Sequence, residues 1–71
     1  MLVGKKTMTL NLTDAEMAVL EELCIKKDLS KTAVLRQALR LLQRVDEQLE
    51  ARQKLYFENP VTGARTEVLM L

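Results

Sequence analysis

The stretch Lys6-Thr7-Met8-Thr9-Leu10-Asn11-Leu12 decides how the rest of the chain is interpreted. Its apolar and polar residues alternate, which is typical of a strand with one buried face and one face in water. The two faces of that strand would carry Met8, Leu10 and Leu12 on one side and Thr7, Thr9 and Asn11 on the other. A lone strand leaves its backbone donors and acceptors unpaired, and two helical patterns follow it directly. The sequence therefore predicts that this strand pairs with the same strand of a second chain.

Length and composition also favour assembly. The chain has 71 residues, one cysteine (Cys24) and no histidine, so neither an internal disulfide nor a zinc site is expected. A domain this small usually needs a disulfide, a metal or oligomerisation to be stable. Apolar residues make up 48% but aromatic residues only 3%, which predicts an aliphatic core of packed helices. We expect one domain, a homodimer, no metal and no cofactor.

Charge is unevenly distributed although the net charge is only +1. Residues 1–45 carry eight basic and five acidic side chains, whereas residues 46–71 carry three basic and five acidic ones. A basic front half permits a polyanionic partner without requiring one. No segment is apolar enough to span a membrane, and no apolar run follows the first lysines as in a signal peptide. These features predict a cytoplasmic protein without a membrane partner.

Two helices are predicted after the strand. Thr13-Asp14-Ala15-Glu16 has the pattern of a capping box and begins a helix over residues 14–27. Asp28 stands where a left-handed residue would end that helix, and Ser30 is a natural N-cap for a second helix over residues 31–53. Apolar residues recur at helical spacing in both helices. With the apolar face of the strand they form the expected dimer core: Met8, Leu10, Leu12, Met17, Leu20, Cys24, Val34, Leu35, Ala38, Leu42 and Val45.

The remaining residues form two terminal segments. Residues 1–4 are predicted to be a flexible arm, and residues 5–54 the dimerisation and DNA-binding domain. Residues 55–71 are predicted to form a C-terminal β-hairpin, with strands over 55–58 and 65–71 joined by a turn over 59–63. The fold class is thus mainly α with a short β-strand and a terminal hairpin.

The polar residues suggest contacts with DNA. A two-stranded ribbon fits the major groove, where asparagine and threonine can contact base edges, so the candidates for base contacts are Thr7, Thr9 and Asn11. Free amides at a helix start attract anions, and with nearby lysines they give the candidates for phosphate contacts: Lys5, Lys6, Ser30, Lys31 and Thr32. Each set also has a plainer explanation, as a solvated strand face, a simple helix cap or solvated lysines.

Three arginines recur every four residues in the second helix, at Arg36, Arg40 and Arg44. They could form a basic ridge, but pairing with Glu47 and neighbouring carboxylates is favoured. No combination of nucleophile, base and orienting group is present, so catalytic residues are not expected and the chain is not predicted to be an enzyme.

This order of elements resembles the ribbon-helix-helix family of Arc/MetJ/CopG-like repressors. The resemblance rests on residues 5–13 and on Leu29-Ser30-Lys31-Thr32-Ala33-Val34, and covers roughly residues 5–50. It implies an intertwined homodimer whose antiparallel ribbon enters the major groove, with the outward strand residues on bases and the second helix start on phosphate. Asp28 departs from the glycine that the family often has at this position, and the tail lies outside the shared core.

The sequence therefore predicts a DNA-binding transcriptional regulator, acting as a repressor, whose dimers can assemble further on DNA. The alternative is a protein-interaction module, such as an antitoxin or adaptor, whose tail over residues 55–71 binds a partner protein. That tail could instead pack on its own dimer as a lid. A helix-turn-helix protein is disfavoured, because the apolar stripe of the second helix is too continuous and the strand would be unexplained.

Overall fold

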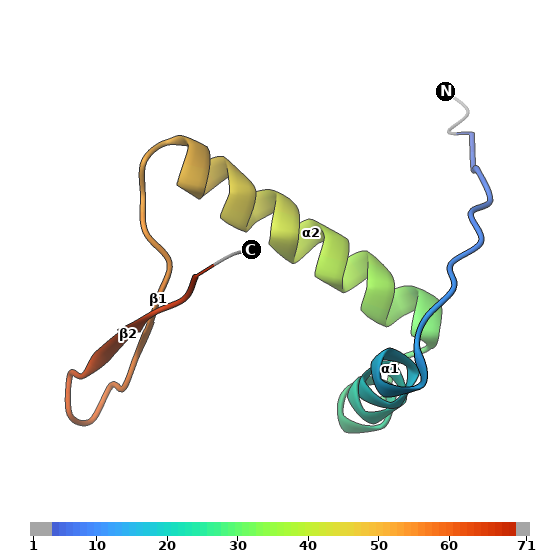
Figure 1. The fold of residues 1–71 in the computed structure, drawn as a ribbon, viewed down its shortest axis with the longest axis horizontal. Coiled ribbons are helices and arrows are strands. Elements are labelled where there is room, and N and C mark those ends of the chain that lie inside the picture. Colours follow the sequence, from blue (N-terminus) through green and yellow to red (C-terminus); the bar gives the residue numbers. More distant parts are fainter. Residues whose placement is uncertain (1–3, 70–71) are drawn as a thin grey trace. The chain divides into compact units, whose positions relative to one another are not determined.

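The computed structural model describes residues 4–69 and contains two helices followed by a β-hairpin (Figure 1). The helices are α1 (Asp14–Lys27) and α2 (Lys31–Glu50), and the strands are β1 (Tyr56–Glu58) and β2 (Arg65–Glu67). The expected class, mainly helical with a short two-stranded antiparallel sheet, is confirmed. Within the described residues, no helix is both long and apolar enough to cross a membrane. The chain divides into two units, residues 1–34 and 35–71, which are described separately.

Helix α1 begins at the predicted capping box. The Oγ1 atom of Thr13 accepts a hydrogen bond from the amide of Glu16 at 3.1 Å, and the Oε1 atom of Glu16 accepts one from the amide of Thr13 at 2.9 Å. Two amides that the first helical turn would otherwise leave unpaired are therefore satisfied. Asp14 and Glu16 add negative charge at the positive end of the helix dipole.

The junction between the helices is also as predicted. Asp28 is left-handed, with φ 52° and ψ 48°, and its amide donates to the carbonyls of Cys24 and Ile25. The amide of Leu29 donates to the same Cys24 carbonyl at 3.1 Å, which completes the pattern of a Schellman motif. Ser30 then caps α2, because its Oγ atom accepts from the amide of Ala33 at 3.1 Å.

Helix α2 is shorter than predicted, since it ends at Glu50 and not at Gln53. Arg52 takes a left-handed conformation with φ 63°. Its amide donates to the carbonyl of Leu49 at 3.0 Å, and the amide of Gln53 donates to that of Gln48 at 2.9 Å. This is a second Schellman-type ending, formed without glycine or asparagine.

The predicted C-terminal hairpin is present, with shorter strands. β1 and β2 pair antiparallel, with Tyr56 opposite Glu67 and Glu58 opposite Arg65. In the turn, the Oδ1 atom of Asn59 accepts from the amides of Val61 and Thr62 at 2.9 and 3.3 Å, and Gly63 supplies a φ of 75°. The second strand ends at Glu67, and the last two residues of the predicted strand, Met70 and Leu71, lie outside the described residues.

Residues 4–12 have no secondary structure in the single chain, and Figure 1 shows them as a trace leading into α1. None of the backbone hydrogen bonds found outside the helices and strands of residues 4–69 involves this segment. The predicted ribbon needs a second chain, so its pairing stays a prediction. Most of the predicted flexible arm, residues 1–3, lies outside the described residues.

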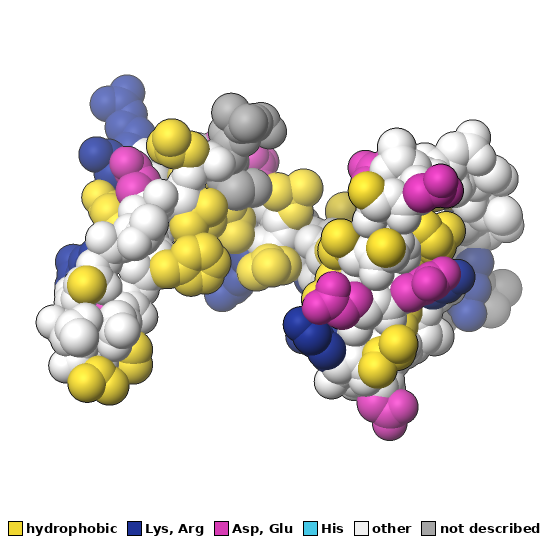
Figure 2. Space-filling model, turned by 60° about the horizontal axis from the view of Figure 1, so that its bottom comes forward, with side chains coloured by type: hydrophobic (Ala, Val, Ile, Leu, Met, Phe, Trp, Pro, Cys, Tyr) yellow, Lys and Arg dark blue, Asp and Glu magenta, His cyan; other side chains and the backbone are white. Residues whose placement is uncertain are grey.

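The core of the single chain is very small. Among the described residues, Leu20 (7% exposed) and Val34 (5% exposed) are the buried hydrophobic side chains, and both belong to the unit of residues 1–34. Figure 2 shows hydrophobic side chains open at the surface. Of the predicted dimer core, four further residues are half-buried: Leu12, Met17, Cys24 and Val45. The others are exposed: Met8, Leu10, Leu35, Ala38 and Leu42.

Candidate nucleic-acid interface

The segment before α1 presents its polar side chains to solvent. Thr7, Thr9 and Asn11 are exposed, as are Lys5 and Lys6. No side-chain hydrogen bond or ion pair within residues 4–69 engages these five residues. Their donors and acceptors are therefore available to an outside partner. On the opposite face Met8 is 80% exposed and Leu10 49% exposed, whereas Leu12, next to α1, is half-buried.

The start of α2 holds the second group of candidates. Ser30, Lys31 and Thr32 are exposed, and the Ser30 hydroxyl caps the amide of Ala33. Within the described part of the chain, the amides of Lys31 and Thr32 have no hydrogen-bond acceptor. Free amides at a helix start, together with the positive end of the helix dipole, can bind an anion.

A carboxylate that the sequence analysis does not single out lies beside this helix start. The Oε1 atom of Glu21, on α1, is 3.8 Å from the Nζ atom of Lys31. Both side chains are more than half exposed, so the attraction is weak. The pair joins two helices across a turn, and helical spacing rules relate residues only within one helix. No local sequence pattern could therefore have found it.

The structure brings the two groups of candidates into one unit, residues 1–34, but no hydrogen bond or ion pair among the described side chains links them. Each group is placed by the helix capping described above. The capping box at Thr13 starts α1 directly after Leu12, and the left-handed Asp28 turns the chain so that Ser30 can start α2.

The favoured interpretation of the α2 arginines was wrong. Arg36, Arg40 and Arg44 are exposed, and none comes within 4.0 Å of a carboxylate among residues 4–69. The predicted pairing with Glu47 is absent. Three unpaired guanidinium groups thus line the polar side of α2, in the unit of residues 35–71.

One ionisable group in the first unit has a shifted pKa. The pKa of Glu16 is lowered from 4.5, first because its carboxylate accepts the backbone amide of Thr13 and second because it lies by the Thr13 hydroxyl. This carboxylate belongs to the helix cap. Among the described residues, no three His, Cys, Asp or Glu side chains are grouped so that they could hold a metal ion.

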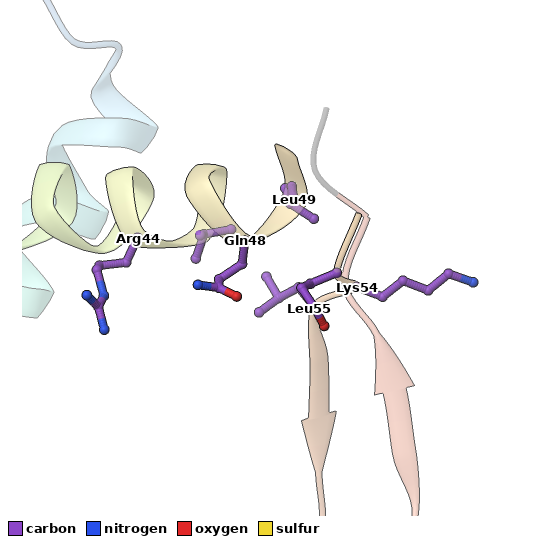
Figure 3. A pocket seen from close by; sticks show the side chains of 7 residues that line it. Arg44, Gln48, Leu49, Lys54 and Leu55 are labelled. Carbon is purple, nitrogen blue, oxygen red and sulfur yellow. The ribbon is translucent and has the colours of Figure 1, made fainter. Parts of the chain in front are cut away.

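The unit of residues 35–71 contains a hollow of about 360 Å³ at the end of α2 (Figure 3). Three apolar side chains line it. Val45 and Leu49 belong to the last turns of α2, and Leu55 belongs to the segment that follows the helix. Polar residues complete the lining: Arg44, Gln48, Gln53 and Lys54. In Figure 3 the side chain of Lys54 extends away from α2, so it does not converge with Arg44 on a shared ligand position.

Comparisons of the chain with models of known protein families, with curated proteins and with solved structures found no match.

Proposed function

We propose that the chain is a DNA-binding transcriptional regulator of the ribbon-helix-helix type, acting as a repressor. In this proposal two copies pair residues 6–12 as an antiparallel ribbon that enters the major groove. The observation that carries it is the segment before α1, which has no backbone hydrogen-bond partner among residues 4–69 and runs straight into a capped helix. Such a segment with a free polar face has the reach and the chemistry to contact base edges.

The exposed hydrophobic side chains of the single chain support pairing with a second chain. Large hydrophobic side chains lie open in the single chain, among them Met8 (80% exposed), Leu39 (70% exposed) and Leu41 (66% exposed). Among the described residues the buried hydrophobic side chains are Leu20 and Val34, so one chain has little apolar burial to offset its conformational entropy.

The proposed contacts divide into two kinds. Thr7, Thr9 and Asn11 contact bases and supply sequence specificity. Lys31, with Ser30 and Thr32 at the start of α2, contacts phosphates and fixes the position of the dimer on DNA. Lys5 and Lys6 add further phosphate contacts next to the ribbon.

The test is a gel-shift titration against the DNA upstream of the protein's own gene, with random DNA as competitor and a series of salt concentrations. We expect tight, salt-dependent and sequence-preferring binding. Asn11→Ala should reduce the preference for the specific site by about tenfold, the range expected for one lost bidentate base contact. Gln43→Ala, an exposed amide on α2, is the matched control and should behave as wild type. If the wild-type protein bound the upstream DNA and random DNA with equal affinity, the proposed base contacts would be refuted.

A second candidate function is protein interaction through the tail, as in an antitoxin or adaptor. The observation in its favour is the exposure of apolar side chains there, with Phe57 70%, Leu69 77% and Val61 91% exposed. Deleting residues 55–71 separates the two functions. Loss of a co-purifying partner with unchanged dimerisation and DNA affinity would support the interaction function.

A further inference from the structure

The hairpin has two chemically different faces. Beyond the β1–β2 pairs, the amide of Val68 donates to the carbonyl of Leu55 at 2.8 Å, so the same register continues by one pair. Side chains alternate between faces along each strand. One face therefore carries Leu55, Phe57, Thr66 and Val68, and the other carries Tyr56, Glu58, Arg65 and Glu67.

The polar face is suited to solvent, and the apolar face is not. On the polar face, the Nε atom of Arg65 donates to the Oε1 atom of Glu58 at 3.0 Å. On the apolar face, Leu55 and Val68 are half-buried but Phe57 is 70% exposed. A two-stranded hairpin is at best marginally stable unless its apolar face packs against another element. Within residues 35–69, nothing covers Phe57 in this way.

The apolar face of the hairpin continues an apolar surface of α2. Leu55 lines the same hollow as Val45 and Leu49, and it lies beside the end of the helix in Figure 3. Leu42, Val45 and Leu49 follow one another at three- and four-residue intervals, so they share one side of α2. Leu42 and Val45 belong to the predicted dimer core, and Leu49 continues the same side of the helix. Apolar side chains thus follow one another from the middle of α2, along the hollow and its polar lining residues, to the base of the hairpin.

We propose that a second copy of this chain covers the apolar face of the hairpin, together with the apolar side of α2. The inference rests on the homodimer of the proposed function and extends its interface beyond the ribbon and helices. A two-fold interface uses the same patch on both chains, and apolar side chains on the same patch of each chain can pack against one another in this way. Leu42 is 51% exposed and Phe57 is 70% exposed, so both the helix part and the hairpin part of this surface are open to a second copy. The hairpin is then a part of the dimer and not a free tail.

The experiment compares two adjacent aromatic residues on opposite faces of β1 in the full chain. Phe57→Ser removes an aromatic ring from the apolar face, and Tyr56→Ser removes one from the polar face with a similar loss of strand propensity. Sedimentation velocity over a dilution series gives the dimer dissociation constant of each protein. We expect Phe57→Ser to raise this constant by at least about tenfold and Tyr56→Ser to change it by less than about threefold. Leu49→Ser, on the helix part of the same surface, should behave like Phe57→Ser.

A measurement on the unmodified protein complements the variants, because Phe57→Ser could simply unfold the hairpin. An NMR experiment on a mixed dimer of isotope-labelled and unlabelled wild-type chains detects contacts between protons of different chains. We expect such contacts from Phe57 to apolar side chains of the second copy.

The possible results separate this inference from the proposed function. A wild-type protein that is monomeric at all concentrations refutes the dimer itself. A wild-type dimer that Phe57→Ser leaves unchanged, or a wild-type dimer in which Phe57 makes no contact with the second copy, overturns only this inference. In that case the apolar face of the hairpin is free for another partner, as the second candidate function requires.

Discussion

The Glu16 carboxylate links helix capping to pH. Its pKa is lowered from 4.5 because the charged form accepts the Thr13 amide, so the contact stabilises the folded state above the unfolded pKa. This stabilisation is lost as the pH falls from about 4.5 through the lower folded value. We expect Glu16→Gln, which can still accept the amide but cannot be protonated, to flatten the acid loss of stability between pH 5 and pH 3. Thermal unfolding followed by circular dichroism tests this, and identical acid profiles for both proteins would contradict it.

Glu21 and Lys31 give a second prediction at the residue scale. If Lys31 contacts phosphate, Lys31→Ala should weaken binding to all DNA sequences about equally and reduce the salt slope by about one. Glu21→Gln should strengthen binding, since the carboxylate 3.8 Å away competes with phosphate for the ammonium group. Glu22→Gln is the control, because it makes the same charge change on the same helix while Glu22 pairs with Lys26 at 2.8 Å. Fluorescence anisotropy with labelled DNA measures each effect.

A double variant makes the Glu21 test specific. In the Lys31→Ala background, Glu21→Gln should no longer strengthen binding more than Glu22→Gln does. An equal gain from both glutamines in the wild-type background would show that only overall charge matters.

Both helices end on a left-handed residue that is not glycine, and this leads to a prediction at the scale of the element. Asp28 has φ 52° and Arg52 has φ 63°. Aspartate tolerates this conformation better than arginine, which has a long side chain and no local hydrogen bond to compensate. Arg52→Gly should therefore raise the unfolding free energy by about 0.5–1 kcal/mol, and Asp28→Gly by less. Thermal unfolding at one fixed protein concentration compares them, and a larger gain at position 28 would contradict the strain argument.

In the hairpin turn, a substitution at a left-handed position is predicted to lower the stability. Gly63 has φ 75°, and a Cβ atom there would meet nothing within 4 Å, so conformation alone opposes a side chain. Gly63→Ala should destabilise the hairpin by about 1 kcal/mol. The Val68 amide should then exchange faster, whereas Gly4→Ala, also without neighbours within 4 Å, should leave its exchange unchanged.

Elements with local signals could be predicted from the sequence, and elements decided by distant partners could not. The capping box at Thr13, the left-handed Asp28, the Ser30 cap and the Asn59–Gly63 turn each depend on residues a few positions apart. The end of α2 was predicted too late, because Arg52 is not a residue type that signals a left-handed ending. The ion pair of Glu21 with Lys31 depends on tertiary placement, which short-range spacing does not encode. The unpaired arginines of α2 have a different cause, because helical spacing permits a weak surface ion pair without requiring one.

At the scale of the whole molecule, stability should depend on protein concentration. A chain whose residues 4–69 bury two hydrophobic side chains, Leu20 and Val34, is expected to gain most of its stability on association. For a two-state dimer, each tenfold increase in concentration adds about 1.4 kcal/mol to the apparent stability. The melting temperature should therefore rise steadily over a hundredfold dilution series measured by calorimetry. A melting temperature independent of concentration would refute obligate dimerisation.

If the chain is the repressor proposed above, the small core of the single chain also has a consequence for gene control. When association and folding are one step, the amount of folded dimer at low expression grows with the square of the chain concentration. Newly made chains below that level remain open to proteolysis, because unfolded chains are degraded faster than folded ones. Occupancy of an operator would then stay near zero until synthesis passes a threshold and would rise steeply above it. A repressor whose single chain has a core as small as Leu20 and Val34 would therefore respond sharply to its own rate of synthesis.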